Sequence, residues 1–189
     1  MTTLNIDYSK TALVLIDLQK GIVAAPGGNE VVQKAEKLVQ VFRENEAFIS
    51  FVKVDFHDGK DALHPALDIE AASKFAERAE DWAQFDSRLN VTEKDYVVTK
   101  RQWGAFFGTD LDIQLRRRGI DTIVLCGVAT NIGEESTARE AFQHGYNQIF
   151  ITDAMTSFSQ EEHEMSLRFI FPRIGKLRTT DEFLEQVRS

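Results

Sequence analysis

Six short apolar runs, rich in β-branched residues, recur along the chain and alternate with stretches whose apolar residues are spaced three or four positions apart. The runs are continuous, which is typical of strands in a parallel sheet buried on both faces. They predict strands at residues 11–16, 47–54, 95–99, 121–126, 147–152 and 175–179. The stretches between them predict helices at residues 30–44, 69–80, 109–118, 132–144, 160–170 and 180–187.

Strands that alternate with helices predict an α/β fold of three layers, α/β/α. The expected architecture is a Rossmann-like, mostly parallel six-stranded sheet with helices on both faces. We expect a single domain over residues 1–189, with an irregular excursion at about 56–90.

Three residue pairs have the spacing of a capping box, in which a Ser, Thr or Asn side chain and a Glu three residues later close the first turn of a helix. The pairs are Ser159 with Glu162, Thr179 with Glu182, and Asn131 with Glu134. If Asn131 is an N-cap, Gly133 lies in a first turn whose backbone N–H groups have no intrahelical partner. Such amides can hold an anion or a developing oxyanion.

Composition narrows the class of protein. The formal net charge of -8 argues against a broad nucleic-acid surface, and the basic run from Arg116 to Arg118 is interpreted as a solvated helix end. No apolar run reaches the roughly 18 to 20 residues that span a bilayer, and MTTLNIDYSK lacks the pattern of a signal peptide. The single cysteine, Cys126, cannot form an internal disulfide. We therefore expect a cytoplasmic protein that binds neither nucleic acid nor membrane.

Candidate chemistry lies where three predicted strands end. Asp17 follows the first strand, Lys100 follows the third, and the turn at 127–133 follows the fourth. Ligands of open parallel sheets bind at this edge, and a carboxyl beside an ammonium there is a candidate site of perturbed pKa. Asp17 is alternatively a turn cap, and Lys100 alternatively a solvated lysine.

The chain resembles the isochorismatase-like hydrolase superfamily, in an order and spacing that cover residues 11 to 155. The stretches that carry the resemblance are ALVLIDLQKGI, VVTKRQWGAFFGTDL, RGIDTIVLCGVATNIGEESTARE and ITDAM, with a similar tail in FPRIGKLRTTDEFL. The closest likeness is to a bacterial subgroup that carries KRQWGAFFGTDL and ATNIG. The resemblance implies homodimers or homotetramers and no cofactor.

The resemblance also implies a triad of Asp, Lys and Cys, and here Gly133 stands at the position of the cysteine. Asp17 and Lys100 match the other two members. Cys126 lies seven positions earlier at a strand end, which favours a buried structural role. A cis peptide of the family would fall at Val128–Ala129.

Isochorismatases resemble this chain in carrying glycine at that position, and they cleave a vinyl ether with water. By this analogy Asp17 is the general acid, Lys100 its partner, and Gly133 contributes backbone and space only. An ammonium beside Asp17 lowers the pKa of its carboxyl, so burial or the carboxylates of the substrate would have to outweigh the ammonium. The residues expected to bind the substrate are Gln19, Trp103, Ala129 and Asn131.

Several neighbouring residues have simpler interpretations. Glu134 suits a cap residue that favours the helix dipole; facing the site instead, it would disfavour a dicarboxylate such as isochorismate. Phe106 and Phe107 suit core or subunit packing, and His144 and His163 suit helix surfaces.

Two further hypotheses compete with a nucleophile-free hydrolase of a small-molecule substrate. One is a non-catalytic module that binds a small anion or supports assembly. The other is metal-assisted amide hydrolysis at Asp55, His57 and His64, whose residue types and spacing are similar to the zinc ligands of nicotinamidases.

Overall fold

The computed structural model describes residues 4–68 and 78–187, and its strands form one sheet in which every neighbouring pair is parallel. The strand order is β3-β2-β1-β4-β5-β6. The strands are β1 (Thr11–Ile16), β2 (Phe48–Val54), β3 (Tyr96–Lys100), β4 (Thr122–Val128), β5 (Asn147–Thr156) and β6 (Lys176–Arg178). The predicted six-stranded α/β sheet is confirmed, and it is parallel throughout.

Helices connect the strands, as predicted for most of the chain. They are α1 (Lys20–Val23), α2 (Gly28–Glu44), α3 (Leu111–Arg117), α4 (Glu135–Gln143), α5 (Gln160–Met165), α6 (Phe171–Ile174) and α7 (Thr180–Val187). Shorter turns are the 3-10 helix η2 (Ser87–Leu89) and the π-helices η3 (Thr130–Glu134) and η4 (Ser166–Ile170).

Two helix predictions need correction, and a third falls largely outside the described residues. The stretch predicted as one helix at 160–170 is α5 followed by η4, and the helical path continues into α6, where Pro172 occupies the first turn. The helix predicted at 132–144 begins as the π-helix η3, two residues earlier. Of the helix predicted at 69–80, only residues 78–80 are described, and they are not helical.

Two of the three predicted capping boxes form. The Glu162 amide donates to Ser159 Oγ at 3.3 Å, and the Thr179 amide donates to Glu182 Oε2 at 2.8 Å. The Asn131 prediction is wrong, because η3 begins at Thr130 and places Asn131 inside the turn.

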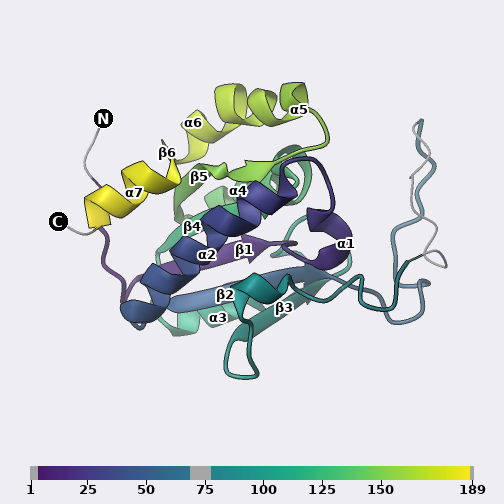
Figure 1. Cartoon of the computed structure of the whole chain (residues 1–189), viewed down its shortest axis with the longest axis horizontal. Coiled ribbons are helices and arrows are strands. Elements are labelled where there is room, and N and C mark those ends of the chain that lie inside the picture. Colours follow the sequence, from purple (N-terminus) through teal and green to yellow (C-terminus); the bar gives the residue numbers. More distant parts are fainter. Residues whose placement is uncertain (1–3, 69–77, 188–189) are drawn as a thin grey trace.

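The sheet separates two apolar cores, and each face is covered by helices. Figure 1 shows α2 and α7 on the near face, with α3 and α4 behind the sheet. Leu13 and Leu15 of β1 belong to the core beneath α2, whereas Val14 and Ile16 belong to the core on the other side. This alternation, with every residue of β1 buried, explains the continuous apolar run in the sequence.

The strand order reverses at β1, which lies between β2 and β4. In such sheets the crevice at the carboxyl ends of the two central strands is where ligands bind. Asp17 follows β1 directly, and β4 ends at Val128, so both open onto this position.

Residues 55–68 and 78–86, between β2 and η2, lie at the same edge of the sheet (Figure 1). These two described stretches hold no helix and no strand longer than a single bridge residue. No helix in the described ranges is long and apolar enough to cross a membrane.

Candidate functional site

Asp17 and Lys100 form a buried ion pair at the carboxyl edge of the sheet. Lys100 Nζ donates to Asp17 Oδ2 at 2.7 Å, and the two residues are only 2% and 5% exposed. Lys100 stands at the end of β3, so its side chain reaches Asp17 past the end of β2. Its ammonium also donates to the carbonyls of Trp103 at 2.7 Å and Gln102 at 3.2 Å. Lys100 is therefore held by three acceptors, and the alternative of a solvated lysine is wrong.

Asp17 adopts a backbone conformation that is uncommon for a residue with a side chain. Its φ is +55°, in the left-handed region that Asp tolerates better than most residues. Its amide donates to the Val52 carbonyl at 2.9 Å, which fixes the turn after β1 against β2.

Burial, more than its partner, sets the proton affinity of Asp17. Removal from water raises the pKa of the Asp17 carboxyl to about 6, although the Lys100 ammonium acts in the opposite direction. Burial therefore outweighs the lysine, and with a pKa of about 6 the carboxyl is mostly protonated only below pH 6.

Gly133 lies against this ion pair. A Cβ placed on Gly133 would be 3.2 Å from Asp17 Oδ2, 3.5 Å from Lys100 Nζ and 3.0 Å from Ile16 Cγ2. The space that the glycine leaves is therefore narrow and faces both charged groups.

The turn that carries Gly133 begins at a cis peptide between Val128 and Ala129, as expected. The Ala129 carbonyl accepts hydrogen bonds from the amides of Ile132 at 3.1 Å and Glu134 at 3.2 Å. Two amides that were expected to be free for an oxyanion are thus occupied. The π-helical geometry, which the sequence does not reveal, is the reason.

Asn131, expected to bind substrate, contacts other parts of the protein. Its Oδ1 accepts from Ser157 Oγ, and its Nδ2 donates to Glu162 Oε1 at 3.4 Å. Next to it, Thr130 Oγ1 is 2.7 Å from His163 Nδ1. His163 is therefore not a plain surface residue, and burial lowers the pKa of its imidazole.

Gln19 is fully buried, and its side-chain amide is used structurally. Oε1 accepts from the Val54 amide at 2.9 Å, while Nε2 donates to the carbonyls of Val54 at 3.0 Å and Trp82 at 3.4 Å. These bonds tie the segment after residue 78 to the end of β2. They leave the predicted substrate contact of Gln19 without support.

The aromatic residues after Lys100 divide between core and surface. Phe106 is buried and packs against Tyr146, with ring centroids 5.8 Å apart. Trp103 and Phe107 are 62% and 72% exposed. The backbone carbonyl of Trp103 accepts a hydrogen bond from Lys100, and this is how Trp103 contributes to the site. The type of side chain at this position does not predict such a contact.

Glu134 is the site residue whose position the sequence did not reveal. It is completely buried, and neither carboxyl oxygen has a hydrogen-bond partner among residues 4–68 and 78–187. Burial and the nearby charge of Asp17 raise the pKa of Glu134 well above its usual range. Its interpretation as a cap residue is wrong, because the amide end of η3 is capped by backbone alone.

Cys126 is fully buried in the core on the α2 side, as predicted. Burial raises the pKa of its thiol well above the usual value, which keeps it protonated.

The three candidate metal ligands are not assembled. Asp55 binds Lys53 Nζ at 2.9 Å, and His64 Nε2 lies 3.1 Å from the Gly59 carbonyl. The His57 amide donates to Asp61 Oδ2 at 3.0 Å. Across residues 4–68 and 78–187, no group of three or more His, Cys, Asp or Glu side chains is arranged to hold a metal ion.

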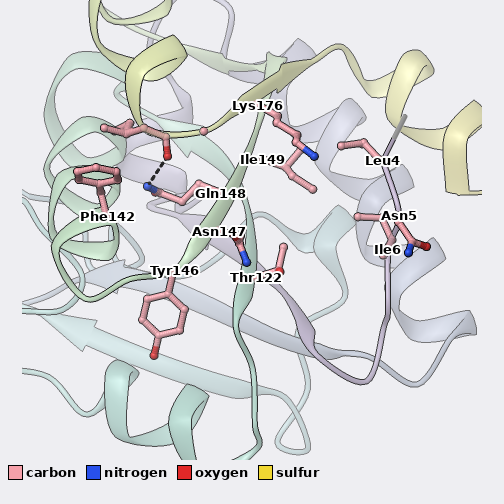
Figure 2. Close-up of a pocket in the computed structure, with 12 residues that line it drawn as sticks. Leu4, Asn5, Ile6, Thr122, Phe142, Tyr146, Asn147, Gln148, Ile149 and Lys176 are labelled. Atoms are coloured by element: carbon pink, nitrogen blue, oxygen red, sulfur yellow. Dashed lines mark hydrogen bonds between the residues drawn. The ribbon is translucent and has the colours of Figure 1, made fainter. Parts of the chain in front are cut away.

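A separate hollow of about 410 Å³ lies at the opposite edge of the sheet. Figure 2 shows residues from the N-terminal segment and from the starts of β4, β5 and β6 around it, with Gln148 donating to the Ile174 carbonyl. None of its lining residues belongs to the Asp17–Lys100 site, so the hollow is distinct from the candidate chemistry.

Comparison with known proteins agrees with this geometry. Residues 11–182 match the model of the isochorismatase domain. The chain is 69% identical over 188 residues to the isochorismatase family protein YwoC of Bacillus subtilis strain 168, with 100% of both chains covered. A solved isochorismatase family protein from Burkholderia thailandensis is 42% identical, with a TM-score of 0.92 over 99% of this chain and 98% of that chain.

A solved N-carbamoylsarcosine amidase from Thermoplasma acidophilum is more distant, at 26% identity and a TM-score of 0.75, covering 92% of this chain and 98% of that one. A family model that covers most of the chain, together with relatives of this similarity, establishes the assignment. The chain belongs to the isochorismatase family and is a hydrolase.

Proposed function

We propose that this protein hydrolyses a small molecule without a protein nucleophile, using Asp17 as general acid and base and Lys100 as its partner. The observation that carries the proposal is the buried contact of 2.7 Å between Lys100 Nζ and Asp17 Oδ2, beside Gly133, which the resemblance matches to the family cysteine. Thioester chemistry needs a thiolate near this pair, and the buried Cys126 does not supply one.

The reaction that fits these groups is hydrolysis of a vinyl ether or a related bond. Protonated Asp17 donates its proton to the substrate's methylene carbon, which leaves an oxocarbenium ion. Water adds to the cationic carbon and returns a proton to the Asp17 carboxylate. The resulting hemiketal separates into a ketone and an alcohol. No covalent bond to the protein forms.

Lys100 has two functions in this scheme. Its three hydrogen bonds fix the ammonium, and through it they fix the orientation of the Asp17 carboxyl. The ammonium also stabilises the carboxylate that remains after proton transfer. A carboxyl with a pKa of about 6 exchanges its proton readily near neutral pH, which general acid–base catalysis requires.

The alternative of a module that binds a small anion has less support. The amides of Ile132 and Glu134 are bonded to Ala129, and two buried carboxyl side chains lie at the same edge of the sheet. In its ionised form a carboxyl group disfavours an anion through both charge and lone pairs.

The test is a substrate screen that includes isochorismate, simpler vinyl ethers and small amides, run on the unaltered protein and on Asp17→Asn. We expect turnover that the substitution reduces by about a hundredfold or more, the range of a lost general acid. Asp153→Asn serves as a control, because Asp153 is also partly buried and paired with a lysine, Lys34, at 2.9 Å. Equal turnover in Asp17→Asn and the unaltered protein would refute the mechanism.

A further inference from the structure

Three buried carboxyl oxygens near the end of β1 lack a hydrogen-bond partner among the described residues. They are Oδ1 of Asp17 and both Oε atoms of Glu134. The two residues are 5% and 0% exposed, so bulk water does not satisfy them. Buried polar atoms are nearly always hydrogen-bonded, and an exception calls for a functional explanation.

Backbone register places Glu134 at the junction of β1 and β4, just before Asp17. Gly127 of β4 pairs with Ile16 of β1, the residue before Asp17. A Cβ on Gly127 would lie 2.8 Å from Glu134 Oε1 and 2.0 Å from the Ile16 carbonyl oxygen. The Glu134 carboxyl therefore occupies the β1–β4 junction, where only glycine admits it.

Charges at this junction balance only while Glu134 keeps its proton. Lys100 supplies one ammonium, and its three acceptors are Asp17 and two backbone carbonyls. Glu134 has neither a cation nor a donor of its own in the described structure. The groups that face it electrostatically are Asp17, Lys100 and the protonated thiol of Cys126, which adds no positive charge.

We propose that Glu134 determines the specificity of this site by binding, together with Asp17 Oδ1, a cationic nitrogen group of the substrate, of the amidinium or guanidinium class. A planar cation of this class presents several N–H donors in a fixed geometry that matches carboxyl oxygens. It also supplies a positive charge that favours the ionised form of Glu134. The inference rests on the proposed function, because it assigns a recognition group to the same site.

The proposal makes binding depend on pH in a defined direction. Glu134 holds its proton at neutral pH when the site is empty, since burial and Asp17 both raise its pKa. A bound cation favours the carboxylate, so binding releases a proton and becomes tighter as pH rises. Asp17 titrates near pH 6, so measurements from pH 7 to 9 isolate the effect of Glu134.

Three probes of nearly the same shape test the recognition: acetamidinium, acetamide and acetate. Affinities are measured from the shifts of the Gly127 and Gly133 amide peaks in nitrogen–proton correlation spectra. We expect acetamidinium to bind at least tenfold more tightly than acetate to the unaltered protein at pH 8. Glu134→Gln, which keeps the shape of the side chain, removes most of this preference.

Glu135→Gln is the matched control, because Glu135 is adjacent but bonded to Arg139 and Ser166. It keeps the preference for acetamidinium. If Glu134→Gln does not fold, the test is the pH dependence of the unaltered protein. Acetamidinium affinity that rises from pH 7 to 9 supports the proposal, and affinity that does not rise contradicts it. Absence of binding, equal affinity for acetate, or a preference that survives Glu134→Gln overturns the inference. None of these outcomes alters the Asp17-dependent turnover that tests the proposed function.

Discussion

Lys100 donates one hydrogen bond to Asp17 and two to the carbonyls of Gln102 and Trp103. The carboxyl and the segment after β3 are thus held by a single ammonium. Because the ammonium lowers the pKa of Asp17 while burial raises it, the two effects are separable by substitution.

Lys100→Met should raise the pKa of Asp17 above its present value of about 6, because only the lowering influence is removed. The inflection of log kcat/KM that reports Asp17 should move to higher pH by about 1 to 3 pH units, the usual effect of one close charge. The variant should also lose about 1 to 3 kcal/mol of stability, since two carbonyls lose their donor.

A pH–rate profile with any substrate found in the screen provides the measurement. Lys53→Met is the control, because Lys53 pairs with the more exposed Asp55 at 2.9 Å. An inflection that moves equally in both variants, or in neither, contradicts the assignment of Asp17 as the titrating acid.

Glu134→Gln should stabilise the protein at alkaline pH and leave it nearly unchanged near pH 4. The pKa of Glu134 is raised in the folded state, so the folded protein holds this proton more tightly than the unfolded chain does. Stability from this group is fully present below the unfolded pKa of about 4.5 and is lost as pH rises toward the folded pKa.

Within that window the unaltered protein should lose roughly 1 kcal/mol per pH unit relative to Glu134→Gln. Urea unfolding at pH 4, 6 and 8 measures the difference. Asp17 contributes a similar loss between pH 3.8 and about 6 in both proteins, so it cancels in the comparison. A constant difference across pH would mean that Glu134 is ionised in the folded protein.

The sheet could be predicted because each strand is marked by an apolar run within a few consecutive residues. Every residue of β1 is buried, so a strand that is covered on both faces is recognisable from one nearly continuous apolar run of six residues. The strand ends that carry Asp17 and Lys100 followed from the same pattern, and the topology of parallel sheets brings such ends to one edge.

The site's finer features depend on geometry that one sequence does not contain. Glu134 has the spacing of a capping partner for Asn131, and a regular helix would have placed it as one. The π-helix η3 rotates the turn, so that Asn131 contacts Ser157 and Glu134 is buried. The glycine at position 127 was the one indication in the sequence that a neighbouring group comes unusually close here. In the structure its φ is +145°, and a Cβ would collide with the Ile16 carbonyl oxygen at 2.0 Å.

Trp103 and Phe107 should mediate self-association. Both are large aromatic residues with most of their surface exposed, and they lie within one short segment after β3. Burial of such side chains is a common source of interface energy. Light scattering should show a smaller assembly for the double variant Trp103→Ser, Phe107→Ser. Ile113→Ser, which alters an exposed residue of α3, should leave the mass unchanged.

Gly133→Cys should create a reactive thiol at the ion pair. The added Cβ would lie 3.2 Å from Asp17 Oδ2 and 3.5 Å from Lys100 Nζ, so the sulfur would be within reach of both groups. An ammonium at this distance lowers the pKa of a thiol and makes it nucleophilic. The contact of 3.0 Å with Ile16 Cγ2 requires only a small movement of a side chain.

We expect Gly133→Cys to react with iodoacetamide at least tenfold faster than the unaltered protein, whose only thiol is the buried Cys126. Weak hydrolysis of an activated ester should accompany this reactivity. Gly133→Ala controls for the added Cβ without the thiol, and Asp17→Asn combined with Gly133→Cys tests whether the acid assists. Alkylation no faster than in Gly133→Ala would show that the charged pair does not activate a nucleophile at this position.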